Sequence, residues 1–416
     1  MLEKIIESVN LARLVERHDL LAKCTTESSL GVNRQALSLE DINARKLLIQ
    51  WAEMIDMQAF TDAASNLFLR YEGKFPDLPP VIAGSHIDSQ PTGGKYDGVF
   101  GVLSALEVAE SFYKNQFKPD HSFEVVCWMN EEGSRFAPGM MGSSVFSGYK
   151  SLNDIIDIVD DDGFSIASGI EYVRSALPSV PIREFGFPIK CYLEPHIEQA
   201  PFLERADVVI GAVKGMQGKK TFAVTVTGRA DHVGTVPLSE RDDALLWATQ
   251  IMHQLYSAVI NDDEDVKFTI GKLIVEPNAP SVVPSKVTFS IDLRHPHQSP
   301  LDHYESLIIA VISKYSSKKS VKLTPLVDDP VIEFPTELIS SIIFAAKELG
   351  ISSTTILSLA GHDSKFLHKI TPTGMIFIPC SEGISHNPAE AVHPDHLFDG
   401  TRVLCHTLYH QLQLSR

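Results

Sequence analysis

The chain has 416 residues, of which 44% are hydrophobic and 21% are charged, and its formal net charge is −17. This composition is typical of a soluble globular protein, and the length favours two domains or one domain with a large insertion. An excess of acidic side chains repels phosphate backbones, which argues against nucleic acid as a partner.

Cysteine usage and the N-terminus indicate the cellular compartment. Five cysteines are scattered along the chain without a CxxC pair, which argues against a disulfide framework and for a reducing environment. The residues after Met1 are typical of an amphipathic helix rather than a signal peptide. No apolar run approaches the roughly 18 residues that a membrane span needs. We therefore expect a cytoplasmic protein with no membrane partner.

The first third of the chain alternates helical and strand patterns. Apolar residues recur at helical spacing over 2–21, and Ser38 with Asp41 resembles a capping box that opens a second helix. Further elements are predicted in this order: strands over 66–71 and 80–85, a helix over 97–112, and a strand over 123–129. This alternation predicts an α/β fold with a central sheet flanked by helices.

The pattern changes near Gly211, where a different set of elements begins. These are strands over 221–227, 266–275, 287–294 and 321–327, with helices over 241–259 and from a Ser299 N-cap to 315. The β-α-β-β-α-β order is that of a ferredoxin-like domain. After Asp328 the α/β pattern returns. We therefore predict a catalytic domain of residues 1–211 and 329–416, interrupted by an inserted domain of residues 212–328.

The stretch GSHIDSQPTGGKYDG over residues 84–98 follows a predicted buried strand. His86 and Asp88 are two residues apart, so on an extended segment their side chains point the same way. This spacing suits a metal-binding imidazole held by a carboxylate. Two glycines then allow a tight turn that brings Asp97 toward His86. A surface histidine before an ordinary glycine-rich turn would have the same pattern, so this stretch alone does not establish a metal site.

Further candidate ligands follow other predicted strands. Glu131 and Glu132 are adjacent, and neighbouring carboxylates repel unless a cation or a proton lies between them. Beside a metal, one can bind the ion while the other takes a proton from water. The alternative is a helix N-terminus, which favours acidic residues. Together the chain offers five candidate ligands of nitrogen and carboxylate type, which suit two divalent ions bridged by one carboxylate. They are His86, Asp97, Glu132, His196 and His386.

Five stretches together resemble the hydantoinase/carbamoylase group of the M20 (carboxypeptidase-G2/aminoacylase-like) metal-dependent amidohydrolases. They are GSHIDSQPTGGKYDG (84–98), NEEGSRFAPGMMGS (130–143), EPHIEQAPFLE (194–204), DHVGTVPLSERDDA (231–244), and AGHDSKF with MIFIPCSEGISHNPAE (within 360–390). The resemblance is greatest to N-carbamoyl-L-amino-acid hydrolases and β-ureidopropionases. It implies a homodimer in which a catalytic domain holds two divalent ions (zinc, manganese, cobalt or nickel) and an inserted lid domain dimerises.

The resemblance also implies a role for individual residues. Asp97 would bridge the two metals, and Glu131 would be the general base. Asp88 would orient His86. In the inserted domain, His232 matches the family histidine that stabilises the oxyanion. The remaining metal ligands would be His86, Glu132, His196 and His386, and the substrate-binding residues would be Gln199, Asn278, Arg294 and His362.

Arg294 is also predicted from its position to bind a carboxylate. It lies on the polar face of a predicted strand, and a planar guanidinium can hold a carboxylate through two hydrogen bonds. The alternative is a surface ion pair with Asp292 or another neighbour.

The implied reaction is hydrolysis of N-carbamoyl-L-amino acids or β-ureidopropionate to the amino acid, ammonia and carbon dioxide. Allantoate hydrolysis is the alternative, followed by an M20-type aminoacylase or peptidase. A metal-free binding module is disfavoured because every implied ligand is present. Nucleotide binding at residues 215–221 is disfavoured because only two residues separate the glycines, whereas a P-loop has four. A serine nucleophile is disfavoured because no G-x-S-x-G elbow occurs.

Overall fold

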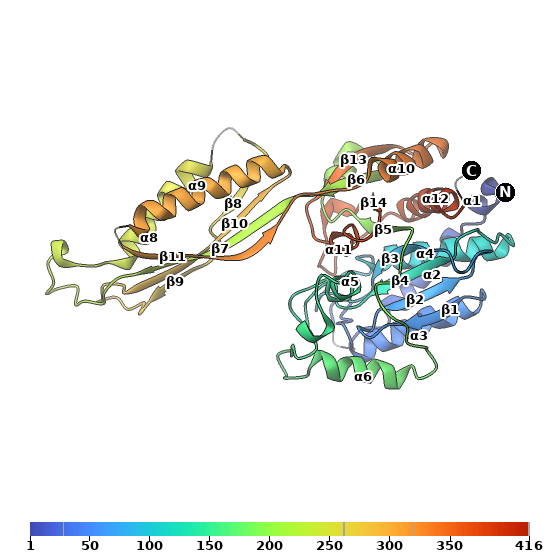
Figure 1. Ribbon diagram of the computed structural model, residues 1–416, viewed down its shortest axis with the longest axis horizontal. Coiled ribbons are helices and arrows are strands. Elements are labelled where there is room, and N and C mark those ends of the chain that lie inside the picture. The colour runs from blue at the N-terminus through green and yellow to red at the C-terminus, as the bar shows by residue number, and fades with distance from the viewer. Residues whose placement is uncertain (28, 261–262, 318, 415–416) are drawn as a thin grey trace. The chain divides into compact units, whose positions relative to one another are not determined.

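The computed structural model describes residues 1–27, 29–260, 263–317 and 319–414. The chain forms two compact units, the first from Met1–Lys214 with Phe334–Arg416 and the second from Gly215–Glu333 (Figure 1). Each unit has its own apolar core. The predicted α/β fold, with a mixed sheet flanked by helices, is confirmed.

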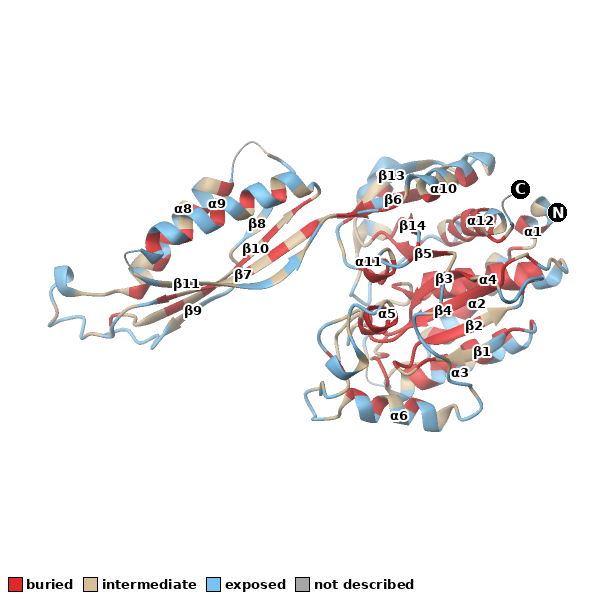
Figure 2. Ribbon diagram, viewed as in Figure 1, coloured by how far each residue is buried: buried red, intermediate tan, exposed pale blue. Residues whose placement is uncertain are grey.

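The main sheet contains nine strands among the described residues, in the order β1-β2-β4-β3-β5-β14-β6-β12, with β13 also paired to β6. Four adjacent strands of this sheet, β4, β3, β5 and β14, run parallel to one another. All four are buried along their whole length (Figure 2). Their carboxyl ends therefore meet at one edge of the sheet, where open α/β sheets bind ligands. The strands are β1 (Gln58–Thr61), β2 (Leu67–Tyr71), β3 (Val81–His86), β4 (Phe123–Trp128), β5 (Cys191–Ile197), β6 (Ile210–Met216), β12 (Ile332–Glu333), β13 (Ser353–Ser358) and β14 (Thr373–Ile378).

Local sequence explains where the helices of the first unit begin. The predicted helix over 2–21 is two helices, because Asn10 caps the second by accepting the N–H of Arg13. Ser38 accepts the N–H of Asp41, as the capping pattern predicts. The α-helices are α1 (Leu2–Glu7), α2 (Leu11–Ala22), α3 (Leu39–Glu53), α4 (Val99–Lys114), α5 (Met141–Phe146), α6 (Ile166–Ala176), α7 (Phe202–Ala206), α10 (Thr336–Glu348), α11 (Ser364–Leu367) and α12 (Pro394–Gln411).

The second unit contains an antiparallel sheet in the order β11-β7-β10-β8, with β9 also paired to β10. Alternate side chains of β7 and β10 are buried and pack with those of α8 and α9. The elements are β7 (Gly218–Thr227), α8 (Ala244–Val259), β8 (Lys267–Thr269), β9 (Leu273–Glu276), β10 (Lys286–His295), α9 (Gln298–Ser316) and β11 (Ser320–Asp329).

Two predictions for this unit are wrong in detail. The strand predicted over 266–275 is two strands, because β8 and β9 pair with different parts of β10. The helix predicted to be capped by Ser299 begins at Gln298 with His297 at the N-cap. Pro300 still lies in the first turn, where its missing N–H costs no helical bond. Among the described residues, no helix is both long and apolar enough to cross a membrane.

Candidate metal centre

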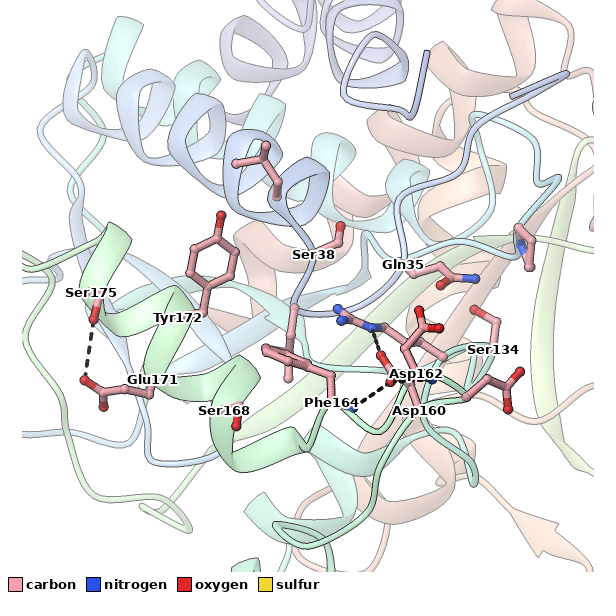
Figure 3. A pocket seen from close by; sticks show the side chains of 15 residues that line it. Gln35, Ser38, Ser134, Asp160, Asp162, Phe164, Ser168, Glu171, Tyr172 and Ser175 are labelled. Atoms are coloured by element: carbon pink, nitrogen blue, oxygen red, sulfur yellow. Dashed lines mark hydrogen bonds and ion pairs between the residues drawn. The ribbon is translucent and has the colours of Figure 1, made fainter. Parts of the chain in front are cut away.

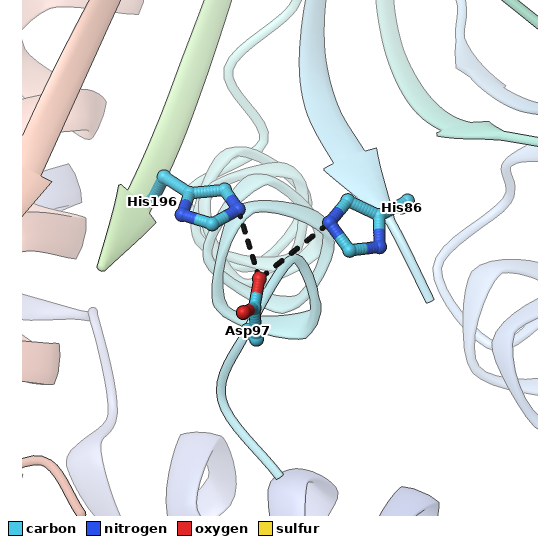
Figure 4. A group of neighbouring side chains, drawn as sticks. All are labelled: His86, Asp97 and His196. Carbon is cyan, nitrogen blue, oxygen red and sulfur yellow. Dashed lines mark ion pairs between the residues drawn. The ribbon is translucent and has the colours of Figure 1, made fainter. Parts of the chain in front are cut away.

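Two neighbouring strands and the turn before α4 bring three of the predicted ligands together. His86 is the last residue of β3, and His196 lies near the end of β5, which pairs with β3 in parallel. Asp97 reaches the same edge just before α4. Its Oδ1 lies 3.6 Å from His86 Nε2 and 3.3 Å from His196 Nε2 (Figure 4).

Gly98 makes this close approach possible. Its φ is +65°, and an added Cβ would lie 2.4 Å from the His86 ring. Glycine adopts this backbone conformation without steric cost and leaves the space that the imidazole occupies. The glycine therefore allows Asp97 and His86 to lie side by side.

A second group of ligands forms on the other oxygen of Asp97. His386 Nε2 lies 3.3 Å from Asp97 Oδ2 and 3.2 Å from Glu132 Oε2. The five predicted ligands thus form two groups of three, each with its ligand atoms within 4.8 Å of one another, and both groups contain Asp97. They are His86 with Asp97 and His196, and Asp97 with Glu132 and His386.

Backbone carbonyls orient two of the imidazoles. His86 Nδ1 lies 3.0 Å from the carbonyl oxygen of Asp88, and His196 Nδ1 lies 2.9 Å from that of Ile197. Because a carbonyl oxygen only accepts, each Nδ1 carries a proton, so in the neutral ring the lone pair is on Nε2. This is the tautomer that a metal-binding histidine needs.

Asp88 contacts the site in two ways. Its carbonyl orients His86, whereas its carboxylate Oδ1 is 3.7 Å from His86 Nδ1. The carboxylate instead accepts the N–H groups of Glu131 at 3.2 Å and Glu132 at 3.1 Å. Asp88 therefore also holds the loop that carries the two adjacent acids.

The acidic side chains of the site have strongly shifted pKa values. Burial raises the pKa of Glu131 well above its usual value, and the charges of Asp363 and Glu132 add to the effect. Burial and the charge of Asp97 raise the pKa of Glu132 to about 8. Burial acts in the same direction on Asp97, but hydrogen bonds with His196 and His386 hold its pKa well below the usual value. Crowded, buried acids of this kind are typical of functional sites.

Three residues at the site have a left-handed backbone although none is glycine. They are Asn130, which precedes Glu131, and Gln199 and His386, with φ values of 54°, 57° and 55°. Such conformations cost of order 1–3 kcal/mol each and persist where surrounding contacts enforce them. Their concentration here indicates that the backbone is strained to aim these side chains.

Sequence reasoning missed three residues that support the ligands. Glu390 Oε1 accepts the N–H groups of Tyr96 at 2.8 Å and Asp97 at 3.1 Å. Ser385 Oγ lies 2.6 Å from Asp97 Oδ2. Gln90 donates from Nε2 to Glu132 Oε2 at 2.8 Å. All three lie within the motifs quoted above, but nothing in their residue type distinguished them from their neighbours.

Two of the predicted substrate contacts lie beside the ligands. Gln199 donates from Nε2 to Asp97 Oδ2 at 2.7 Å. His362 is buried, and its ring centroid lies 4.5 Å from that of His196. Both residues line a cavity of about 240 Å³ together with Glu131, Glu132 and three of the other ligands.

The other three predicted residues belong to the second unit. His232 is exposed, and its Nδ1 accepts the N–H of Gly234 at 3.0 Å. Asn278 is also exposed, with a φ of 56°. Arg294 donates from Nε and Nη2 to Asp292 at 2.8 and 3.2 Å. This is the ion pair that was the alternative prediction for Arg294.

The candidate metal centre lies apart from a larger hollow of the first unit. That hollow, of about 800 Å³, is lined by Phe164, Tyr172 and an acidic run from Asp160 to Asp162 (Figure 3). Arg135 donates to Asp160 at 2.9 Å within it. None of the predicted site residues lines this hollow. The chemistry of the side chains, rather than cavity size, therefore identifies the candidate site.

Comparison with known proteins identifies the family. The model of Peptidase family M20/M25/M40 matches residues 82–410. The chain is 36% identical to an N-carbamoyl-L-amino-acid amidohydrolase of Pseudomonas sp. (strain NS671) over 387 residues, 90% of this chain and 92% of that protein. The chain belongs to the M20 family. It is also 34% identical to a Rhizobium meliloti protein of the same name over 403 residues, 96% of each chain. This M20 protein is accordingly a metal-dependent hydrolase of carbon–nitrogen bonds.

Other relatives of this M20 protein have different names. Ureidoglycolate hydrolase of Arabidopsis thaliana is 33% identical over 414 residues, 96% of this chain and 86% of that protein. A solved structure of a hydantoinase/carbamoylase family amidase from Burkholderia multivorans superimposes with a TM-score of 0.87 at 33% identity, covering 98% of this chain and 99% of that one. The predicted resemblance is therefore confirmed at the level of the family, while its members differ in substrate.

Proposed function

We propose that this enzyme uses two divalent metal ions to hydrolyse the carbamoyl amide of N-carbamoyl-L-amino acids or β-ureidopropionate. The observation that carries the proposal is that Asp97 directs one carboxylate oxygen at each of two ligand groups. A carboxylate that two groups share is suited to bridging a pair of ions. The donors are imidazole nitrogens and carboxylate oxygens, a set that accepts zinc, manganese, cobalt or nickel.

His86, Asp97 and His196 would hold one ion, and Asp97, Glu132 and His386 the other. When bound, two such ions would supply Lewis-acid chemistry to a scissile carbonyl and an attacking water. The buried Nδ1 hydrogen bonds of the two strand histidines keep their Nε2 atoms directed into the site. This geometry supports the proposal that these side chains bind metal ions without rearranging.

Glu131 is suited to move the proton in this reaction. It is 9% exposed, and its Oε2 lies 3.4 Å from His86 Nε2. It would take a proton from the attacking water and return it to the leaving nitrogen. A carboxyl whose pKa is raised by burial can both accept a proton and hold it until the carbon–nitrogen bond breaks. The products are the free amino acid, ammonia and carbon dioxide.

Arg294 would bind the substrate carboxylate. Two of the five N–H groups of Arg294 donate to Asp292, and the other three can donate to a second acceptor. Asn278, Gln199 and His362 would make the other substrate contacts. His232 would stabilise the oxyanion, in the same subunit or across a dimer.

We further propose that the enzyme is a cytoplasmic homodimer that associates through the second unit. This unit exposes several large apolar side chains, namely Leu246, Ile260, Leu273, Ile274 and Ile309. Exposed apolar surface of this kind is typical of interaction sites. Light scattering of the protein and of a Leu273→Lys, Ile309→Lys variant would test the proposal. Equal masses for both proteins would contradict it.

A ureide is the second candidate substrate, because two plant relatives are named ureidoglycolate hydrolase. Allantoate, the alternative predicted from the sequence, belongs to the same chemical class. An aminoacylase or peptidase activity is the lesser alternative.

Ammonia release distinguishes these activities. The panel contains N-carbamoyl-L-amino acids, β-ureidopropionate, allantoate and ureidoglycolate, with N-acetyl amino acids assayed for free amine. We expect the highest kcat/KM on an N-carbamoyl-L-amino acid or β-ureidopropionate. Cleavage of only the ureides would favour the second candidate, and cleavage of only the N-acetyl compounds would exclude both.

A further inference from the structure

A cavity of about 260 Å³ lies in the first unit and shares no lining residue with the cavity at the metal centre. Its walls come from α3, from the turn between β1 and β2, and from the segment 152–182 that contains α6. Most of the lining is aliphatic, contributed by Ala63, Leu67, Leu152, Ile170, Val173, Leu177, Val180 and Ile182. Pockets of a few hundred Å³ with an apolar wall and few polar groups are typical of small-molecule sites.

Arg45 is the first polar group of this cavity and is only 2% exposed. Its Nε donates to both oxygens of Asp41 at 3.0 Å, and its Nη1 donates to the carbonyl of Ser65 at 2.7 Å. Its Nη2 has no hydrogen-bond partner within the ranges that the structure describes. Because Arg45 lines the cavity, this nitrogen can donate to a molecule held there. The cavity therefore offers a donor to a ligand.

Asp62 is the second polar group and is also 2% exposed. Its Oδ1 accepts the N–H groups of Ala64 at 2.9 Å and Asn66 at 3.0 Å, and its Oδ2 accepts from Asn66 Nδ2 at 2.8 Å. A carboxylate can accept about four hydrogen bonds, so Oδ2 keeps one position for a ligand. A ligand that places a donor there and an acceptor at Arg45 would satisfy both groups.

The charges around the two groups favour a neutral ligand. Asp41 already balances Arg45, and Arg174, the other cation of the lining, is exposed and pairs with Glu171 at 3.6 Å, so an anionic head group would face the charge of Asp62. A cationic head group would face Arg45. Burial raises the pKa of Asp62 to about 6, so its carboxylate is ionised above that pH.

We propose that this cavity binds a small branched aliphatic molecule with a neutral head group that accepts a hydrogen bond from Arg45 and donates one to Asp62, as an alcohol or a primary amide does. The proposal does not depend on the substrate of the metal centre. The occupied cavity would be linked to that centre by hydrogen bonds, because Asn66 Oδ1 also accepts the N–H of Met129 at 2.9 Å. Met129 lies two residues before Glu131.

Isoamyl alcohol is the probe, because it has the required head group and cannot be hydrolysed at the metal centre. Its binding to the metal-loaded, full-length protein is titrated by ligand-observed NMR at about pH 8, where Asp62 is ionised. We expect saturable binding to one site per chain. Isovalerate, which has the same body and a carboxylate head, should bind about tenfold more weakly or worse.

Ile170→Phe fills the cavity and should weaken alcohol binding about tenfold or more, whereas Ile370→Phe, at an exposed isoleucine, should not. Leu177→Phe fills the cavity from another wall and gives the same test if Ile170→Phe does not fold. The proposal is overturned if the wild type shows no saturable binding or if both filled variants bind the alcohol as well as the wild type. Isovalerate binding as tightly as the alcohol would also overturn it.

Discussion

Glu390 accepts the backbone N–H of Asp97 at 3.1 Å, so one carboxylate positions the carboxylate that both ligand groups share. The same Glu390 oxygen accepts the N–H of Tyr96, and its other oxygen lies 3.1 Å from Ser385 Oγ. Burial raises the pKa of Glu390 to about 7, with the charge of Asp97 adding to the effect. The position of the proposed bridge therefore depends on a residue that binds no metal.

We expect Glu390→Ala to weaken metal affinity about 10- to 100-fold, the range for residues that support a ligand. Glu390→Gln should recover much of this loss, because an amide oxygen can still accept the two N–H groups. Activity measured against metal concentration checks both variants. An unchanged metal titration for Glu390→Ala would show that the turn holds Asp97 without it.

Glu131→Gln should reduce kcat about 10²- to 10⁴-fold, the usual contribution of a general base, while the metal content stays the same. Asp97→Ala should lose both activity and metal, because both ligand groups contain Asp97. Metal analysis of the purified variants beside steady-state kinetics separates the two effects. A near-native rate for Glu131→Gln would remove it from the role of base.

Gly98→Ala should impair the metal centre more than it impairs the fold. Alanine is strained at the positive φ of Gly98, and its Cβ would also displace His86. Gly148→Ala is the matched control, because Gly148 has a φ of +73° and open space around the added Cβ. Thermal unfolding should shift for both variants, and further for Gly98→Ala, whereas metal content should fall only for Gly98→Ala. Equal metal content in the two variants would contradict the packing argument.

Arg294→Ala should raise KM about 10- to 100-fold with little change in kcat, because a charge-assisted hydrogen bond contributes about 1.5–3 kcal/mol. Lys219→Ala is the control, since Lys219 Nζ also lies near Asp292, at 3.7 Å. Kinetics on the best substrate of the panel checks the difference. A KM that rises equally in both variants would indicate a general effect of charge in the second unit.

His18 should make the fold less stable in acid. Burial lowers its pKa from 6.5 to about 4, so between these values the unfolded chain binds a proton that the folded chain does not. The stability from the neutral imidazole is therefore present above pH 6.5 and falls as the pH drops toward 4. At about pH 5 the loss amounts to about 2 kcal/mol.

The His18→Gln variant should lack this part of the acid sensitivity. Urea unfolding of variant and wild type at about pH 7.5 and about pH 5 measures how far the free energy of unfolding falls with pH in each protein. His253→Gln, at an exposed histidine, is the control. Equal pH dependence for His18→Gln and wild type would show that His18 does not titrate on unfolding.

The sequence by itself determined the residue types of the site and the strands that end beside them. Continuous apolar runs predict buried parallel strands, and His86 and Glu131 follow such runs directly. His386, which is far away in the chain, joined the candidate set through its residue type, and the family resemblance then implied a role for each ligand. These inferences succeeded because they depend on local patterns and on chemistry that few residue types can supply.

Only the tertiary structure decided which ligands form each group and what holds them. Asp97 meets His386 and Glu390 across nearly 300 residues of chain, and no local pattern encodes such a distance. The carbonyl rather than the carboxylate of Asp88 lies within hydrogen-bond reach of His86, because the carboxylate accepts the backbone N–H groups of Glu131 and Glu132. Choices among hydrogen-bond partners depend on packing between distant elements, and packing is a property of the folded chain.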